Sequence, residues 1–91
     1  MNVHEVNSLI EKEFDKLKHK VIQKNFDYNN SLQTPLGIFY KGGKTAGILA
    51  RIDDKLNRIV CKGLDDKTED TIDDLIGYLV HYKISKQLEP K

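Results

Sequence analysis

The first segment of the chain alternates apolar and charged residues with the period of a helix. Its apolar side chains recur every three or four positions, at Val3, Val6, Ile10, Phe14, Leu17 and Val21. This spacing predicts one long amphipathic helix with a single apolar stripe. We expect the helix to end near Lys24 or Asn25, because the residues that follow are rich in Asn, Asp and Ser, whose side chains compete for the helical backbone.

Two further long helices follow from the same period. Between Thr45 and Lys62 one face is apolar, and Gly63 supplies a terminator; the apolar residues are Ile48, Leu49, Ile52, Leu56, Ile59 and Val60. The last helix is expected to start at Asp66 and Glu69, which have capping-box spacing, and to bury Ile72, Leu75, Ile76, Leu79 and Val80. A short helical turn is expected from Thr34-Pro35 through Phe39.

No sustained alternation of apolar and polar residues competes with these helices, so the pattern predicts an all-α fold. We expect one domain, residues 1–91, built as a small helical bundle of three main helices plus the short helical turn. A chain of this length buries only roughly 60–65% of its surface on folding. We therefore expect oligomerisation to complete the bundle.

Composition narrows the class of protein. Fifteen basic residues against fourteen acidic ones leave a formal charge of +1, which does not indicate binding to a nucleic acid polymer. No apolar run approaches the ~20 residues of a membrane span, and the N-terminus has no signal-like segment. We therefore expect no membrane partner and a cytoplasmic location. The single cysteine, Cys61, falls in a helical pattern and is expected to be a buried thiol.

Acidic side chains gather away from the apolar stripes of the last two long helices. Asp70, Asp74 and His81 lie opposite Ile72 on a helical wheel, and Asp54 lies opposite its own helix's stripe. One interpretation is structural, with acids favouring a helix dipole and forming surface ion pairs. The other is a binding site, because like charges at i and i+4 repel by about 0.2–0.5 kcal/mol and a divalent cation would relieve the repulsion. His81 fits either a solvent or interface role or a ligand or proton-transfer role.

Three segments, taken in order, resemble a known family. They are Arg51-Ile52-Asp53-Asp54-Lys55-Leu56-Asn57-Arg58, then Glu69-Asp70-Thr71-Ile72-Asp73-Asp74-Leu75-Ile76-Gly77-Tyr78, and upstream Lys24-Asn25-Phe26-Asp27-Tyr28-Asn29-Asn30-Ser31. Together they resemble the all-α, MazG-like nucleotide pyrophosphohydrolase group. The likeness is greatest to its nucleotide-modification-associated branch, found in bacteria and phages.

The resemblance implies a helical bundle that forms a homodimer or homotetramer around a Mg²⁺-nucleotide site. By this resemblance Asp54, Asp70 and Asp74 would bind the metal, and Arg51, Lys55 and Arg58 would contact phosphate. Lys24 belongs to the same nucleotide-binding set, and Asp27 with Tyr28 would close over the base or sugar.

The chain also departs from the family's pattern. It has no E-x-x-E pair, Thr71 stands where a second acid would precede Asp74, and Gly77 replaces the Asn before the tyrosine. Three hypotheses therefore remain open. The chain is a Mg-dependent nucleoside triphosphate pyrophosphohydrolase, a non-catalytic phage-type sponge that sequesters a cyclic or signalling nucleotide, or a helical protein-interaction module.

Overall fold

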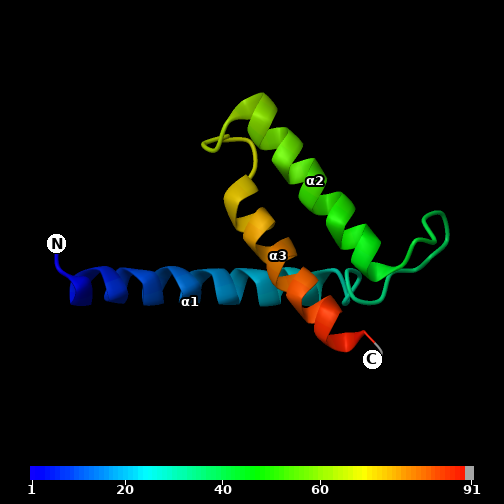
Figure 1. Cartoon of the computed structure of the whole chain (residues 1–91), viewed down its shortest axis with the longest axis horizontal. Helices are drawn as coiled ribbons and strands as arrows, with labels where there is room; N and C mark the ends of the chain where they lie inside the picture. The colour runs from blue at the N-terminus through cyan, green and yellow to red at the C-terminus, as the bar shows by residue number, and fades with distance from the viewer. Residues whose placement is uncertain (90–91) are drawn as a thin grey trace.

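Helices are the only regular elements of the part of the chain that the structure describes. The computed structural model describes residues 1–89 and contains α1 (Val3–Asp27), α2 (Lys44–Lys62) and α3 (Thr71–Leu88) (Figure 1). The expected all-α fold is therefore confirmed. Within residues 1–89, no helix combines the length and hydropathy that crossing a bilayer requires.

α1 runs two residues beyond its expected end. At its start, the side chain of Asn2 accepts a hydrogen bond from the backbone N–H of Glu5 at 2.8 Å, which caps the helix. At its end, Asn29 and Asn30 take φ values of 51° and 61°. This left-handed conformation, which Asn tolerates better than most residues, stops the helix and turns the chain back.

The expectation of a short helical turn from residue 34 to residue 39 is wrong. Residues 35–43 form bends and irregular backbone that lead directly into α2. Thr34 precedes a proline, which disfavours the helical region for Thr34 itself. Gly37 adopts a φ of 71°, so the right-handed path cannot continue through it.

The end of α2 agrees with the sequence prediction, whereas the start of α3 does not. α2 ends as expected at Gly63, whose φ is 80° and whose N–H donates to the carbonyl of Ile59 at 2.8 Å. α3 begins only at Thr71, so the capping box at Asp66 is wrong. Asp66 instead accepts hydrogen bonds from the backbone N–H and the hydroxyl of Thr68, at 2.9 and 2.6 Å, inside the α2–α3 loop.

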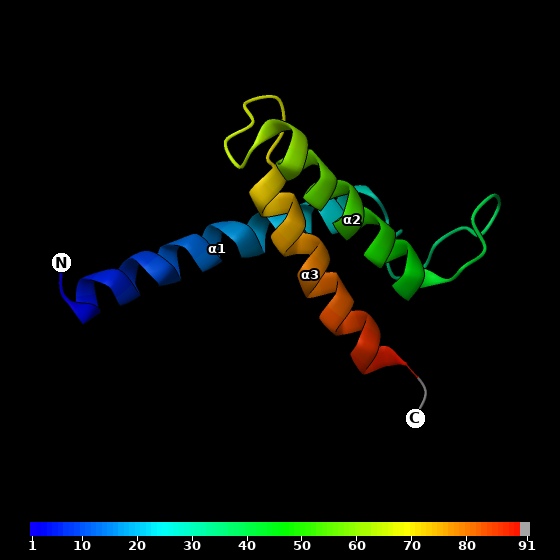
Figure 2. The same cartoon turned by 45° about the horizontal axis from the view of Figure 1, so that its top comes forward.

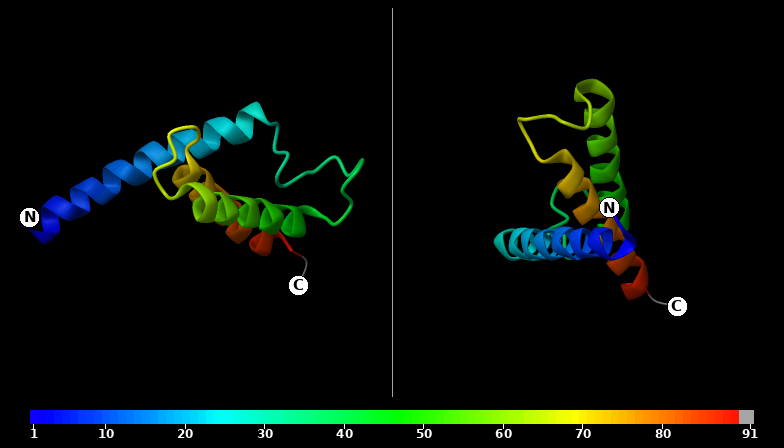
Figure 3. Two further views of the ribbon diagram at one scale, coloured as in Figure 1. Left: turned by 90° about the horizontal axis from the view of Figure 1, so that it is seen from above. Right: turned by 90° about the vertical axis from the view of Figure 1, so that its left-hand side faces the viewer.

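α2 and α3 form an antiparallel helical hairpin, and α1 crosses α3 (Figures 1 and 2). The first half of α1 projects away from the hairpin (Figure 3). The interior between the helices is small. Among the described residues, Ile48 of α2 is the one apolar side chain that is fully buried.

α3 buries mainly its polar side against the other helices, which reverses the expectation for part of its apolar stripe; Leu75 and Ile76, also expected in the core, are half-buried. Its buried residues are Thr71, Gly77, His81 and Ser85. Ile72, Leu79 and Val80, expected in the core, are 42%, 46% and 41% exposed. The reversal follows from charge and size, because lysines of α1 pair with the acids of α3 and Gly77 lets the two helices approach. Cys61 is also exposed, so the expected buried thiol is wrong.

Gly77 sets the distance between α1 and α3. A Cβ atom at this position would lie 3.3 Å from Cγ2 of Val21, closer than ordinary van der Waals contact. We expect Gly77→Asn to force the helices apart and to cost about 1–3 kcal/mol of unfolding free energy. Chemical denaturation measures the loss. Gly47→Asn is the matched control, because a Cβ there meets Tyr40 at an ordinary 3.5 Å; equal stability of the two variants would contradict the close crossing.

Candidate functional site

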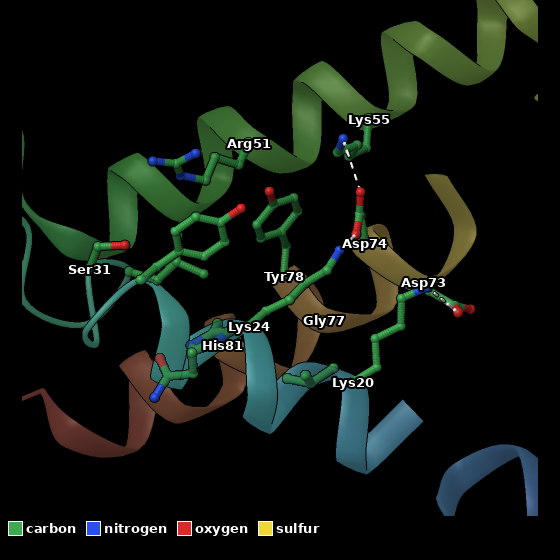
Figure 4. Close-up of a pocket in the computed structure, with 14 residues that line it drawn as sticks. Lys20, Lys24, Ser31, Arg51, Lys55, Asp73, Asp74, Gly77, Tyr78 and His81 are labelled. Atoms are coloured by element: carbon green, nitrogen blue, oxygen red, sulfur yellow. Dashed lines mark hydrogen bonds and ion pairs between the residues drawn. The ribbon is translucent and has the colours of Figure 1, made fainter. Parts of the chain in front are cut away.

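A pocket of about 470 Å³ opens where the three helices meet, within the size range of small-molecule sites. α1 and the turn after it form one wall, α2 the second and α3 the third (Figure 4). The lining residues are Lys20, Val21, Lys24, Asn25, Tyr28, Ser31, Leu32, Arg51, Lys55, Asp73, Asp74, Gly77, Tyr78 and His81. Four are cations and two are acids, so the lining carries an excess of positive charge.

Asp74 is the central acid of the pocket. It forms ion pairs with Lys24 of α1 and, at 3.3 Å, with Lys55 of α2 (Figure 4). Lys55 also donates to Glu69 at 2.7 Å. One carboxylate therefore joins all three helices, and its side chain is only 15% exposed.

The ionisation of this cluster follows from its contacts. Burial alone would raise the pKa of Asp74, but the hydrogen bonds and charges of Lys24 and Lys55 outweigh it and lower the pKa below its ordinary value. Burial would likewise lower the pKa of Lys55, but hydrogen bonds to Glu69 and Asp74 raise it. Asp74 and Lys55 are therefore both charged at neutral pH, which strengthens the contact between α2 and α3.

A second set of ion pairs lies at the rim of the pocket. Lys20 of α1 pairs with Asp70 and, at 3.0 Å, with Asp73. The lysines of α1 at i and i+4 thus face the acids of α3 at i and i+4. The repulsion between Asp70 and Asp74 that the sequence indicated is relieved here by these two lysines.

Arg51 differs from the three lysines of the pocket. It lines the pocket from α2, yet it forms no ion pair with any residue between 1 and 89. A guanidinium group binds carboxylate or phosphate through two parallel hydrogen bonds. Arg51 therefore has its full binding capacity left for an anion in the pocket.

Tyr28 and Tyr78 add aromatic surface beside the cations. Tyr78 points from α3 toward α2, between Arg51 and Lys55 (Figure 4). Flat rings next to cations suit a ligand that has both an aromatic and an anionic part.

His81 lies at the floor of the pocket and is 7% exposed. The side-chain amide of Gln33 donates to Nδ1 of His81 at 3.1 Å and to its carbonyl at 3.0 Å. An amide nitrogen can only donate, so Nδ1 accepts and the ring proton resides on Nε2. Burial lowers the pKa of His81, which keeps the ring neutral at physiological pH. His81 is therefore buried and uncharged, and its Nε2–H can donate a hydrogen bond. It does not face solvent.

The structure separates the acids that the family resemblance assigns to a metal. Asp74 lines the pocket, whereas Asp70 pairs with Lys20 at the rim. Asp54 does not line this pocket; it lies about one helical turn along α2 from Arg51, beside a second hollow that Arg58 and Glu69 also line. Within residues 1–89, no three His, Cys, Asp or Glu side chains form a group that could hold a metal ion. In a single chain, these three carboxylates do not fit a shared Mg²⁺ site.

The candidate nucleotide-binding residues are also divided. Lys24, Tyr28, Arg51 and Lys55 all line the pocket. Arg58 instead binds the α2–α3 loop, where it contacts Asp66 at 2.7 Å and Glu69 at 3.3 Å. Asp27 accepts a hydrogen bond from Gln23 at 2.8 Å and does not line the pocket.

Sequence reasoning missed Lys20, Asp73 and Gln33. The first two carried a usable signal, because lysines at i and i+4 in one helix match acids at i and i+4 in another. Gln33 had none, since its contact with His81 depends on how the turn after α1 folds back.

Comparisons with protein-family models, with curated proteins and with solved structures find no match to this chain. The pocket geometry and the motif resemblance are therefore the two grounds for a function.

Proposed function

We propose that the chain binds a phosphorylated nucleotide in this pocket. The observation that carries the proposal is the convergence of Lys20, Lys24, Arg51 and Lys55, from two helices, around a cavity that tyrosines also line. The cations would neutralise phosphate oxygens, with Arg51 as the first contact because no acid among residues 1–89 pairs with it. Tyr28 and Tyr78 would cover the base.

Capture without hydrolysis agrees best with the contacts of the acids. Asp73 and Asp74, the two carboxylates of the pocket, are already bonded to lysines of α1 and α2. A phosphate would compete with these carboxylates for the same lysines, which requires no metal and no attacking water. Such a protein acts as a sponge that holds a cyclic or signalling nucleotide.

A Mg-dependent pyrophosphohydrolase is the second candidate. It is supported by the order of the motifs that resemble the MazG-like group and by the place of Asp74 on the pocket wall. Metal loading would first have to separate Asp74 from Lys24 and Lys55. The two candidates therefore differ in their dependence on Mg²⁺.

Thermal unfolding with a nucleotide panel tests the proposal. The panel holds nucleoside and deoxynucleoside triphosphates, monophosphates, cyclic dinucleotides and unphosphorylated nucleosides, each with Mg²⁺ or with EDTA. At a hundredfold excess over Kd, a ligand of the native state adds about 2.7 kcal/mol of stability, which is easily resolved in a chain of this size. Nucleosides should give no shift, since they offer nothing to the cations.

The outcome separates the three hypotheses. A shift that persists in EDTA, with the ligand recovered intact, supports capture. A shift that needs Mg²⁺, with release of monophosphate and pyrophosphate, supports the hydrolase. Absence of any shift across the panel contradicts nucleotide binding and leaves the protein-interaction module.

A further inference from the structure

The apolar stripe of α1 continues far beyond the place where the helix is covered. Val21 lies against Gly77 of α3, and Val3, Val6, Ile10 and Phe14 follow on the same face of the helix, by its period, toward the N-terminus. These four side chains are 70%, 41%, 46% and 66% exposed. No residue of α1 is buried. We call Val3, Val6, Ile10 and Phe14 the α1 stripe.

The outer face of α3 is uncovered as well. Ile72, Leu79 and Val80 are between 41% and 46% exposed, because α3 turns its polar side toward α1 and α2. These residues are the α3 outer face. One chain thus presents two apolar surfaces from two helices, and isolated exposed apolar residues would not be arranged in this way.

The total surface measures how much is left uncovered. The accessible area is 7343 Å², whereas a folded monomer of the same mass has roughly 5,400 Å². The radius of gyration is 15.2 Å, against roughly 12 Å for a compact chain of this length. The excess of roughly 1,900 Å² is more than twice the ~800 Å² that each partner contributes to a standard stable interface.

The first half of α1 also needs support to remain helical. It projects beyond the helical hairpin (Figure 3), and α3 is the helix against which α1 packs. Helices shorter than about 12–15 residues are marginal in water without packing of an apolar face. A surface that covers the α1 stripe would therefore also stabilise the helix that carries it.

The charges of α1 indicate what that surface is. The half from residue 3 to residue 14 has three acids and one lysine, and the half from residue 15 to residue 27 has four lysines and two acids. In two antiparallel α1 helices with opposed helix dipoles, the exposed Lys16 and Lys18 of each copy would lie toward the acidic half of the partner, while Lys20 and Lys24 stay with the acids of α3.

We propose that two copies of this chain form a twofold-symmetric dimer, in which antiparallel α1 helices pack the α1 stripe of each copy against the partner's helices. The interface uses one patch twice, as closed twofold symmetry requires. It does not depend on ligand binding, so it stands or falls separately from the proposed function.

The oligomeric state tests the dimer. In sedimentation equilibrium, the wild-type protein should have twice the chain mass of 10.5 kDa. The double variant Ile10→Glu/Phe14→Glu should have a single chain mass, with dimer affinity reduced by at least about a hundredfold, because two carboxylates per chain would be buried without partners. Both side chains are largely free in one chain, so the variant should keep its fold, which circular dichroism checks.

Phe39→Glu is the matched control. Phe39 is 99% exposed in the loop before α2, so the same change of aromatic ring to carboxylate occurs away from the interface. The control should remain dimeric. A monomeric wild type at all concentrations up to those used for structural work, or a dimer that survives the double variant, would overturn the proposal.

Hydrogen exchange of the unchanged protein gives a second test that no mutation can disturb. Amides of residues 3–17 should lose protection on dilution below the dimer dissociation constant, while those of α2 and α3 near Ile48 should keep it. Protection of residues 3–17 that is low at every concentration would contradict a covered α1 stripe.

Discussion

Asp74→Asn should lower the unfolding free energy by about 3 kcal/mol, since removing one partner of a largely buried ion pair leaves the other charge without compensation. Asp74 pairs with two lysines, so the substitution removes the acid that Lys24 contacts and leaves Lys55 with Glu69 alone. A loss of this size corresponds to a fall in Tm of more than about 10 °C in a domain of this length. Urea denaturation measures the free energy, and calorimetry the Tm.

Asp54→Asn is the control for this change. Asp54 is an exposed residue of α2 and makes no ion pair within residues 1–89, so its loss should cost less than about 0.5 kcal/mol of unfolding free energy.

The pH dependence of stability gives a second test of Asp74. The lowered pKa of Asp74 gives stability that is present above its unfolded pKa of about 3.9 and is lost as pH falls through the folded value. Asp74→Asn should remove that part of the acid dependence; a variant within about 1 kcal/mol of wild type would refute the central role of this carboxylate.

Arg51→Ala should weaken nucleotide binding by about ten- to a hundredfold, because hydrogen bonds to a charged group contribute about 1.5–3 kcal/mol. The fold should be unaffected, since Arg51 forms no ion pair with a described residue. Isothermal titration with the nucleotide that stabilises wild type most in the panel measures the affinity, and denaturation confirms the stability.

Two comparisons make the Arg51 result specific. Arg51→Lys keeps the charge but not the planar pair of donors, so it should recover only part of the affinity. Lys12→Ala removes an exposed cation on the far side of α1 and should leave binding unchanged. If Arg51→Ala binds as tightly as Lys12→Ala, the ligand does not contact the pocket through this arginine.

The helices could be predicted from the sequence, because their period and the terminator Gly63 are local properties. The orientation of α3 could not. Its apolar side, Ile72 to Val80, has the regular spacing of a core stripe, yet Lys20 and Lys24 draw the acidic side inward. Which side of an amphipathic helix is covered depends on the partner that meets it, and that partner lies about fifty positions away along the chain.

The candidate site could be predicted only in part, because the sequence gives the spacing of residues along one helix but not the packing between helices. Arg51 and Lys55 are one turn apart on one helix, so the sequence placed them together correctly. Asp54 lies between them in the motif but does not line the pocket; it borders a second hollow together with Arg58 and Glu69. Residues adjacent in a motif are separated by 100° per residue in a helix, and only the packing decides which of them share a cavity.

Backbone amide chemical shifts, recorded while the strongest ligand of the panel is titrated into ¹⁵N-labelled protein, test the central claim most directly. The account requires the largest changes at Arg51, Lys55, Tyr78 and His81, with smaller ones at Lys24 and Tyr28 on the facing wall. Changes confined to the α1 stripe or to the loop before α2, or no change at saturating nucleotide, would contradict it.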